Sequence, residues 1–364
     1  MPATYSPLRL KSMPPLRLWP DDPPADVYFD SVSASINNVG PRDYARRKRQ
    51  LKDPQLTPFL VPQPMRARLG LGPDVELPLV LVFPGGGYVS LTVQAEGRRA
   101  CNWLNLAGVH CVVVEYRTMR RHPAPLLDAR RAVQLVRLHA AAWRVAPRIG
   151  VLGFSAGGHV AGHVSLAWDA AEGGEVDKLL SAKGDRAAAF SARPDAAILA
   201  YPLVSAHNDT VDCSVGRHPF CKCSTYACVG EAARGQPRPL RHHGSFAVLL
   251  GPDLGKSLPR TAEDDVSLDD LALRRPASSP PPPFFLWHTE SDDIVPFQNT
   301  ERLAAALRSR GGAVEAHIFR GAGLKHGLGL AMKFTGRDIG NWTGLCEVWA
   351  GANWQPHGRA WSRG

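Results

Sequence analysis

The stretch IGVLGFSAGGHV at residues 149–160 carries one serine between glycines, where an apolar run gives way to small residues. The run RIGVLGF at 148–154 is typical of a buried strand, and the residues from Ala156 onward are typical of a helix. The pentapeptide at 153–157 fits Gly-x-Ser-x-Gly. So tight a strand-to-helix turn strains the serine backbone and needs neighbours without side chains. It exposes the hydroxyl of Ser155 and points helix N–H groups toward developing negative charge.

Two further residue types follow the serine in an informative order. A serine hydroxyl is a weak nucleophile until a base removes its proton, and the base needs an acid that orients it. Asp292 and Asp293 come just after the strand pattern at 282–289, and His326 lies in a glycine-flanked loop after the next strand pattern. Singly, each residue also fits a helix cap or a surface group. Together with Ser155 they predict one site, because the carboxyl ends of parallel strands meet at one sheet edge.

A glycine-rich turn, PGGGY at 84–88, follows the first clear strand pattern, LPLVLVF at 77–83. Three residues without side chains can turn backbone N–H groups toward a carbonyl oxygen that gains negative charge. Such a turn can also cradle phosphate, but no Lys-Ser/Thr pair follows it and no Gly-x-Gly-x-x-Gly opens the next helix. The turn therefore predicts an oxyanion site and argues against nucleotide binding.

Strand and helix patterns alternate along most of the chain. Continuous apolar runs predict buried strands at 77–83, 109–116, 148–154, 195–202, 282–289 and 313–319. Spacings of three and four predict helices at 98–108, 123–143, 156–168 and 300–312. This order predicts an α/β fold, a doubly wound and mostly parallel sheet with helices on both faces. We expect an N-terminal extension over 1–70, a main domain over 71–350 with an irregular insert at about 204–262, and a C-terminal tail over 351–364.

The composition is that of a globular chain, with 364 residues of which 44% are apolar and 21% charged. No apolar run reaches the roughly 18 residues of a membrane span, and prolines interrupt the N-terminal segment, so we expect a cytoplasmic protein without a membrane partner. The 43 Lys and Arg exceed the 33 Asp and Glu, but they are spread along the chain, and we expect no nucleic acid partner. The basic run at 45–52 fits a localisation signal or an anionic-surface contact, although a solvated helix face is favoured.

Seven cysteines, an odd number without an export signal, favour reduced thiols over a disulfide framework. Cys101, Cys111 and Cys346 are expected to be buried apolar residues. The insert adds donors that leave a structural zinc site open as an alternative to a plain loop: Cys213, Cys221, Cys223, Cys228, His218, His242 and His243. Their spacing does not give two Cys-x2-4-Cys pairs, which favours the plain loop and no metal.

Five segments together resemble the α/β-hydrolase superfamily, and more closely its acetyl-esterase and acetylxylan-esterase-like branch: VFPGGGY, HPAPLLDARRAVQLVR, GVLGFSAGGHVAGH, FFLWHTESDDIVPFQN and HIFRGAGLKHGLGLA. They span about 70–335, most of the chain. The resemblance implies that Ser155 is the nucleophile and His326 the base. It also implies that Asp292, four residues before Pro296, is the orienting acid.

The same resemblance implies that the backbone amides of Ala156 and of Gly86 or Gly87 bind the oxyanion. The implied activity is hydrolysis of a small-molecule carboxylic ester with a short acyl group such as acetate, through an acyl-enzyme and without a metal or organic cofactor. Asp128 and Arg131 match a pair that usually supports the fold near the site.

The chain departs from the family pattern in three places. Related lipases and esterases often carry His-Gly-Gly-Gly, whereas Pro84 stands in the place of the histidine, so a hydrogen bond that steadies the loop is absent. The segment GAGLK before His326 is slightly longer than usual, and the insert at 204–262 falls where the superfamily builds caps. A non-catalytic binding protein on the same scaffold, or a peptidase or acyltransferase with the same triad, stays open, as does the oligomeric state.

Overall fold

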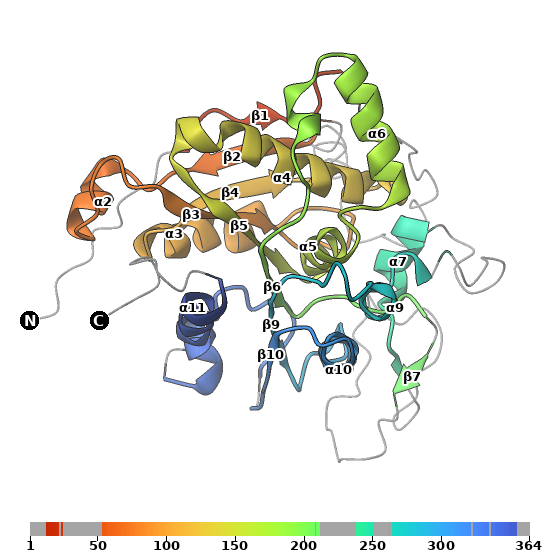
Figure 1. The fold of residues 1–364 in the computed structure, drawn as a ribbon. Helices are drawn as coiled ribbons and strands as arrows, with labels where there is room; N and C mark the ends of the chain where they lie inside the picture. The colour runs from red at the N-terminus through yellow and green to blue at the C-terminus, as the bar shows by residue number, and fades with distance from the viewer. Residues whose placement is uncertain are drawn as a thin grey trace, which may run out of the picture.

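An eight-stranded sheet forms the centre of the computed structural model, which describes residues 12–21, 23–24, 53–207, 209–211, 238–250, 262, 264–321, 323–334 and 336–354. Its strands are β1 (Leu16–Arg17), β2 (Gln55–Phe59), β3 (Leu77–Phe83), β4 (His110–Glu115), β5 (Val145–Phe154), β6 (Ala196–Ala200), β9 (Phe284–Thr289) and β10 (Val314–Phe319). Figure 1 shows the sheet, whose strand order is β1-β2-β4-β3-β5-β6-β9-β10. Neighbours from β4 to β10 are parallel, whereas β2 runs antiparallel to β1 and β4.

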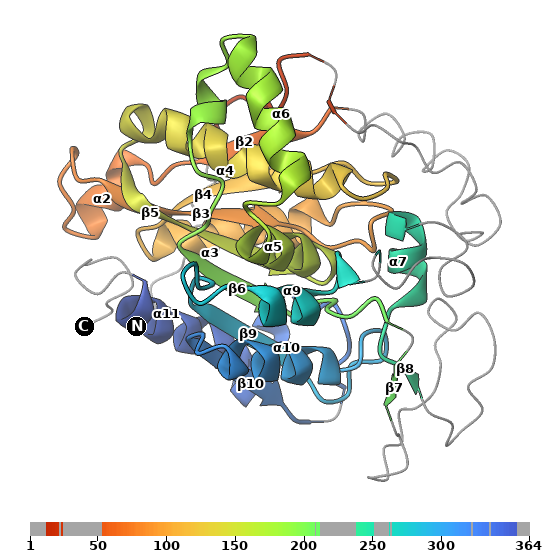
Figure 2. The ribbon, with the colours of Figure 1, turned by 45° about the vertical axis from the view of Figure 1, so that its right-hand side comes forward.

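The α-helices are α2 (Gln63–Arg68), α3 (Arg99–Leu106), α4 (Ala124–Trp143), α5 (Ala156–Leu166), α6 (Ala171–Ala182), α7 (His243–Leu250), α9 (Leu268–Arg274), α10 (Gln298–Ser309) and α11 (Trp342–Asn353). Shorter elements are the π-helix η2 (Val93–Arg98), the 3-10 helices η3 (Arg186–Ala189), η4 (Met332–Phe334) and η5 (Asp338–Asn341), and the strands β7 (Thr210–Val211) and β8 (Arg238–Pro239). Helices α4, α5, α9 and α10 cover one face of the main sheet, and α3 and α11 cover the other (Figure 2). The predicted doubly wound α/β fold is confirmed.

The central strand β3 contributes side chains to the cores on both faces of the sheet. All seven of its residues are buried. Leu79, Leu81 and Phe83 pack in the core beneath α4 and α5, while Val80 and Val82 pack in the core beneath α3 and α11. Because successive side chains of a strand point to opposite faces, a strand covered on both sides reads as an unbroken apolar run.

The segment predicted as an N-terminal extension contributes to the sheet. Strand β2 pairs over its whole length with β4, but β1 pairs only with Gln55 and Leu56. Pro58 therefore lies beyond the pairing with β1, where the missing N–H of proline costs little. The run around Pro58 has no alternating pattern, which is why the sequence did not indicate a strand there.

A buried ion pair joins α4 to the loop after β4. The side chains of Arg117 and Asp128 are fully buried, and a guanidinium nitrogen lies 2.9 Å from the carboxylate. Asp128 also accepts hydrogen bonds from the backbone N–H of Arg117 at 2.8 Å and from the indole N–H of Trp19 at 2.8 Å. Arg131 donates to the backbone oxygen of Leu18 at 2.9 Å. These contacts attach residues 12–21 to the core and agree with a structural role for Asp128 and Arg131.

The structure corrects the expectation of reduced thiols. Cys101 on α3 and Cys111 on β4 form a disulfide with a Cα to Cα distance of 5.2 Å. The turn at Gly108 folds β4 back beside α3, which brings two residues only ten positions apart into bonding range. Disulfides persist mainly in oxidising compartments, so this pair weighs against the predicted cytoplasmic location. Cys346 is free and buried, as predicted.

Several predictions concern residues outside the described ones. They are the basic run at 45–52 and the insert donors Cys213, Cys221, Cys223, Cys228 and His218; the side chain of His243 is also outside them. Within the described residues, none of the helices has both the length and the apolar character needed to span a membrane.

Breaking the buried ion pair is expected to cost far more stability than breaking an exposed one. Asp128→Asn leaves the buried charge of Arg117 uncompensated and should lower the free energy of unfolding by about 3 to 5 kcal/mol. Asp53→Asn breaks the exposed pair with Arg17 and should change it by less than about 1 kcal/mol. Urea denaturation measures both, and similar losses would contradict this account.

Candidate active site

The serine turn between β5 and α5 has a strained backbone that its glycines make possible. Ser155 has φ 53° and ψ −119°, a conformation that residues with side chains rarely adopt. A Cβ on Gly153 would lie 2.2 Å from the backbone oxygen of Gly157, and a Cβ on Gly157 would lie 2.1 Å from that of Phe83. Both glycines are therefore required because three backbones approach one another closely at this corner.

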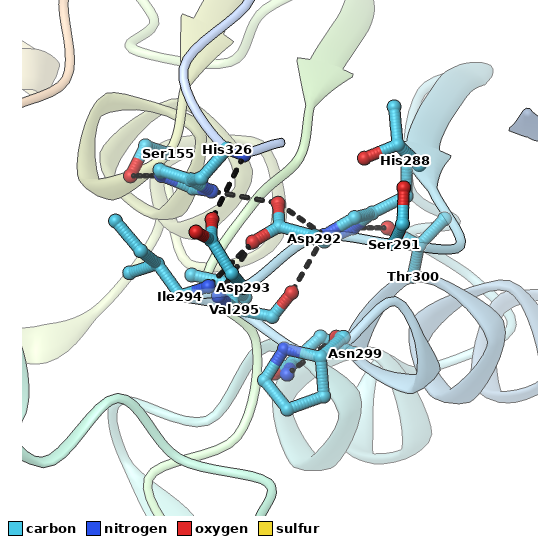
Figure 3. A network of polar contacts seen from close by, with 12 residues as sticks. Ser155, His288, Ser291, Asp292, Asp293, Ile294, Val295, Asn299, Thr300 and His326 are labelled. Carbon is cyan, nitrogen blue, oxygen red and sulfur yellow. Dashed lines mark hydrogen bonds and ion pairs between the residues drawn. The ribbon is translucent and has the colours of Figure 1, made fainter. Parts of the chain in front are cut away.

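A continuous hydrogen-bonded chain joins the serine, the histidine and one of the two aspartates (Figure 3). His326 Nε2 lies 2.8 Å from Ser155 Oγ, and His326 Nδ1 lies 2.7 Å from Asp292 Oδ2. Since a carboxylate only accepts, Nδ1 carries the proton and the lone pair of Nε2 faces the hydroxyl. The fold brings Ser155 and His326 together although 171 positions separate them in the chain.

Asp292 is the carboxylate that contacts the imidazole side chain. Its Oδ1 accepts hydrogen bonds from the backbone N–H groups of Ile294 at 2.9 Å and Val295 at 2.8 Å, and its side chain is 1% exposed. Asp293 instead accepts a long hydrogen bond, 3.4 Å, from the backbone N–H of His326. Asp292 therefore binds the ring of His326, whereas Asp293 binds the backbone of the same residue.

A second histidine, which the sequence did not indicate, contacts this carboxylate. His288 is fully buried at the end of β9, and its Nε2 lies 3.1 Å from Asp292 Oδ2 and 3.0 Å from the backbone oxygen of Val295. Nε2 faces two acceptors and therefore donates, while Nδ1 accepts from the hydroxyl of Thr300 at 2.9 Å. The only sequence signal was the spacing of four between His288 and Asp292, hidden inside a strand pattern.

The two partners shift each other's acidity. Burial alone would raise the pKa of Asp292, but the charge of His326 and the hydrogen bonds from His288 and His326 outweigh it and bring that pKa well below its usual range. Burial alone would lower the pKa of His326, but Asp292, followed by Glu96 and Asp293, raises it above the usual 6.5. The pair therefore favours a carboxylate beside an imidazole that readily takes up a proton.

The glycine loop after β3 lies against the serine turn. A Cβ on Gly85 would come within 3.0 Å of Ser155 Cβ, so the two segments are in close contact. Gly86 and Gly87 have φ +139° and +64°, and a Cβ on Gly86 would lie 2.0 Å from the backbone oxygen of Ser90. Among the described residues, the amides of Gly86 and Gly87 have no hydrogen-bond acceptor. Their N–H groups are thus available to a bound molecule.

Ala156 begins α5 directly after the serine. The first N–H groups of a helix have no acceptor within the helix, and they lie at the positive end of its dipole. The structure thus brings Ser155, Ala156 and the glycine loop to one corner. This corner can bind an oxygen that gains negative charge.

One described cluster has the residue types of a metal site. Potential ligand atoms of His207, Asp264 and Asp270 lie within 4.8 Å of one another. His207 Nε2 lies 2.5 Å from Asp270 and 3.3 Å from Asp264. Burial lowers the pKa of His207, but the hydrogen bond and charge of Asp270 raise it overall. We interpret the cluster as a network of polar contacts in which the two carboxylates favour the charged form of His207.

Comparison with known proteins places the chain in a family. Residues 80–273, more than half of the chain, match the α/β hydrolase fold family. The chain belongs to this family. Residues 260–333 also match the prolyl oligopeptidase family, and this stretch includes Asp292 and His326.

Among solved structures, the chain is similar to an acetyl ester-xyloside bifunctional hydrolase from Caldicellulosiruptor lactoaceticus, with 30% identity, a TM-score of 0.64 and coverage of 93% of this chain and 96% of that one. It shares its fold with the carboxylesterase Cest-2923 from Lactobacillus plantarum WCFS1, with 20% identity, a TM-score of 0.57 and coverage of 85% of this chain and 95% of that one.

Two curated relatives match parts of the α/β-hydrolase chain. Endo-1,4-beta-xylanase B from Butyrivibrio fibrisolvens is 28% identical over 65% of this chain and 30% of its own length. An acetylxylan esterase from Xylanibacter ruminicola is 32% identical over 35% of this chain and 22% of its own length. The chain thus spans less than a third of the length of either relative.

The imidazole of His326 is expected to titrate above 6.5, the ordinary histidine value, because the charge of Asp292 favours its protonated form. Asp292→Asn removes that charge and should lower the midpoint. Asp293→Asn, the matched control, should lower it less. NMR titration of the ring protons measures all three, and a wild-type midpoint below 6.5 or an equal response to both substitutions would contradict this interpretation.

Proposed function

We propose that the protein is a serine hydrolase that cleaves carboxylic esters, with Ser155 as nucleophile, His326 as general base and Asp292 as the acid that orients the base. The observation that carries this proposal is the continuous pair of hydrogen bonds, 2.8 Å and 2.7 Å, from the serine through the imidazole to the carboxylate. The strained turn at Ser155 supports it, because backbone strain is typical of functional sites.

The reaction proceeds by double displacement. Ser155 Oγ attacks the ester carbonyl while His326 Nε2 accepts the hydroxyl proton, and the Asp292 carboxylate stabilises the imidazolium that forms. The imidazolium then donates its proton to the leaving alcohol, which leaves an acyl group on the serine. Water attacks the acyl-enzyme with His326 again acting as base, and the acid product and free serine are released.

The carbonyl oxygen becomes an anion in each tetrahedral intermediate. We assign its donors to the backbone N–H groups of Ala156 and of Gly86 or Gly87. These groups stand at the serine corner, and fixed donors stabilise developing charge without reorganising during the reaction. No step of this mechanism requires a metal or organic cofactor.

For the substrate, we propose acetyl esters of carbohydrates. The proposal is supported by two relatives, one an acetylxylan esterase and the other an acetyl ester-xyloside bifunctional hydrolase. The match of residues 260–333 to the prolyl oligopeptidase family favours a peptidase as second candidate. The same three side chains can cleave an ester or a peptide bond. The two functions therefore differ in the leaving group, which is an alcohol for the esterase and an amine for the peptidase.

Replacement of the nucleophile tests whether the protein is an enzyme. Ser155→Ala should reduce hydrolysis of p-nitrophenyl acetate below about one thousandth of the wild-type rate and abolish labelling by a fluorophosphonate probe. Ser165→Ala, which removes a buried hydroxyl bonded within α5, is the matched control and should keep the labelling. Absence of labelling in folded wild-type protein would favour a non-catalytic binding protein.

A substrate series tests the acyl and leaving groups. Among p-nitrophenyl esters from acetate to laurate, kcat/KM should be highest for acetate, and acetylated xylo-oligosaccharides should be deacetylated. Proline-containing peptide p-nitroanilides should not be cleaved. Turnover of long-chain esters alone would contradict the acetyl specificity, and efficient cleavage of the anilides would favour the peptidase.

A further inference from the structure

A buried carboxylate outside the Ser155 chain lies between the two loops of the site. Glu96 is on the π-helix η2 and is 5% exposed. Among the described residues, no Lys or Arg pairs with it, so its charge is satisfied by hydrogen bonds alone. Single turns of π-helix are rare in proteins, and those that occur often lie at functional sites. A buried charge without a counter-ion is costly, which makes its position a feature to explain.

One carboxylate oxygen fixes the glycine loop. Glu96 Oε2 accepts a hydrogen bond from the backbone N–H of Gly85 at 2.7 Å and another from the hydroxyl of Thr92. The backbone oxygen of Gly85 accepts in turn from the backbone N–H of Thr92 at 2.9 Å, and it lies 3.1 Å from the Thr92 hydroxyl oxygen. Both polar groups of Gly85 are thus held, the N–H by Glu96 on η2 and the oxygen by Thr92 just before η2, next to the two glycines assigned to the oxyanion.

The other carboxylate oxygen reaches the histidine loop through a tyrosine. Glu96 Oε1 accepts from the hydroxyl of Tyr201 at 2.7 Å, and that hydroxyl accepts from the backbone N–H of Gly329 at 2.8 Å. The ring of Tyr201 meets the ring of His326 edge to face, with centroids 5.0 Å apart. Glu96 therefore connects the loop that stabilises charge to the loop that carries the base.

We propose that Glu96 is a positioning residue of the site, and that its carboxylate aligns the glycine loop with His326 and takes the place of the loop-steadying histidine that Pro84 replaces. The inference rests on the proposed esterase function. No contact with substrate is required, because the carboxylate acts through Gly85 and Tyr201.

The charge of Glu96 adds an electrostatic effect to this alignment. The groups that interact with the imidazole of His326 are Asp292 and Asp293 after β9, Glu96 on η2, the Tyr201 ring after β6 and the Ser155 hydroxyl. Each of the three carboxylates favours the protonated form of the His326 ring, and none of them exchanges a proton with the substrate. Loss of the Glu96 charge should therefore lower the pKa of the His326 imidazole, although the two side chains form no hydrogen bond.

Glu96→Gln tests the proposal, because the amide keeps the shape but loses the charge and one acceptor. We expect kcat for p-nitrophenyl acetate to fall about 10-fold to 100-fold, while KM changes by less than about 3-fold. The NMR titration midpoint of His326 should also fall. A folded variant, judged by thermal melting, with wild-type kcat and a wild-type midpoint would overturn the proposal.

Tyr201→Phe supplies a second test that keeps the ring against His326 and removes only the hydroxyl. It should lower kcat, and the double variant with Glu96→Gln should lose less than the product of the two single losses, because both act through one connection. Ser165→Ala is the control. It removes a buried hydroxyl that donates to the backbone oxygen of Ala161 within α5 at 2.7 Å, and any loss that it causes should multiply with that of Glu96→Gln. Multiplicative losses for the Tyr201 pair would count against the proposal.

Different results would overturn the esterase function and the positioning role of Glu96. If wild-type protein is not labelled by the fluorophosphonate and hydrolyses no ester, the proposed function fails. The NMR midpoint of His326 still reports on Glu96 in that case, since it needs no substrate. An unchanged midpoint in Glu96→Gln then rejects the positioning role independently.

Discussion

The site depends on the close approach of three backbones at the Ser155 corner. The end of β3, the turn after β5 and the start of α5 pass so near one another that a single methyl group on Gly153 or Gly157 would overlap a backbone oxygen. Packing this tight holds a strained serine in place. It also puts the first N–H groups of α5 beside the hydroxyl and fixes where the glycine loop starts. Asp292 follows β9 and His326 follows β10, and the side chains of both residues reach the Ser155 corner from these distant strands.

The charges around His326 are arranged to favour a cation at one ring. Asp292, Asp293 and Glu96 all raise the pKa of the imidazole, although burial opposes them. Asp292 remains ionised because His326, His288 and two backbone amides all favour its charged form. This arrangement suits a reaction in which the imidazole gains and loses a proton in each half. Among the described residues, the buried carboxylate of Glu96 is satisfied by hydrogen bonds rather than by a Lys or Arg.

Local patterns predicted the parts of the structure that depend on local physics. The strand at 77–83 was recognised because burial on both faces leaves an unbroken apolar run, and the serine turn because its geometry excludes side chains at fixed positions. The order of serine, acid and histidine indicated His326 and one of the two acids Asp292 and Asp293, because parallel strands end at one edge, and the family resemblance then favoured Asp292.

The features that the sequence did not indicate depend on contacts between distant segments. Glu96 precedes an ordinary helix pattern, and its partner Tyr201 lies 105 positions away. His288 was hidden in a strand pattern, although its contact with Asp292 spans only four positions. The disulfide was missed because a count of cysteines says nothing about where a turn places two of them. Strand β2 was missed because pairing with β4 outweighs a proline in a short run.

The central claim is that Ser155 becomes covalently acylated through the chain it forms with His326 and Asp292. Rapid quenching of wild-type protein during turnover of an acetyl ester, followed by peptide mass spectrometry, tests it most directly. The account predicts acetyl groups on the peptide that contains Ser155 and nowhere else above background. Hydrolysis without acetylation of that peptide, or with acetylation of a different residue, would contradict it.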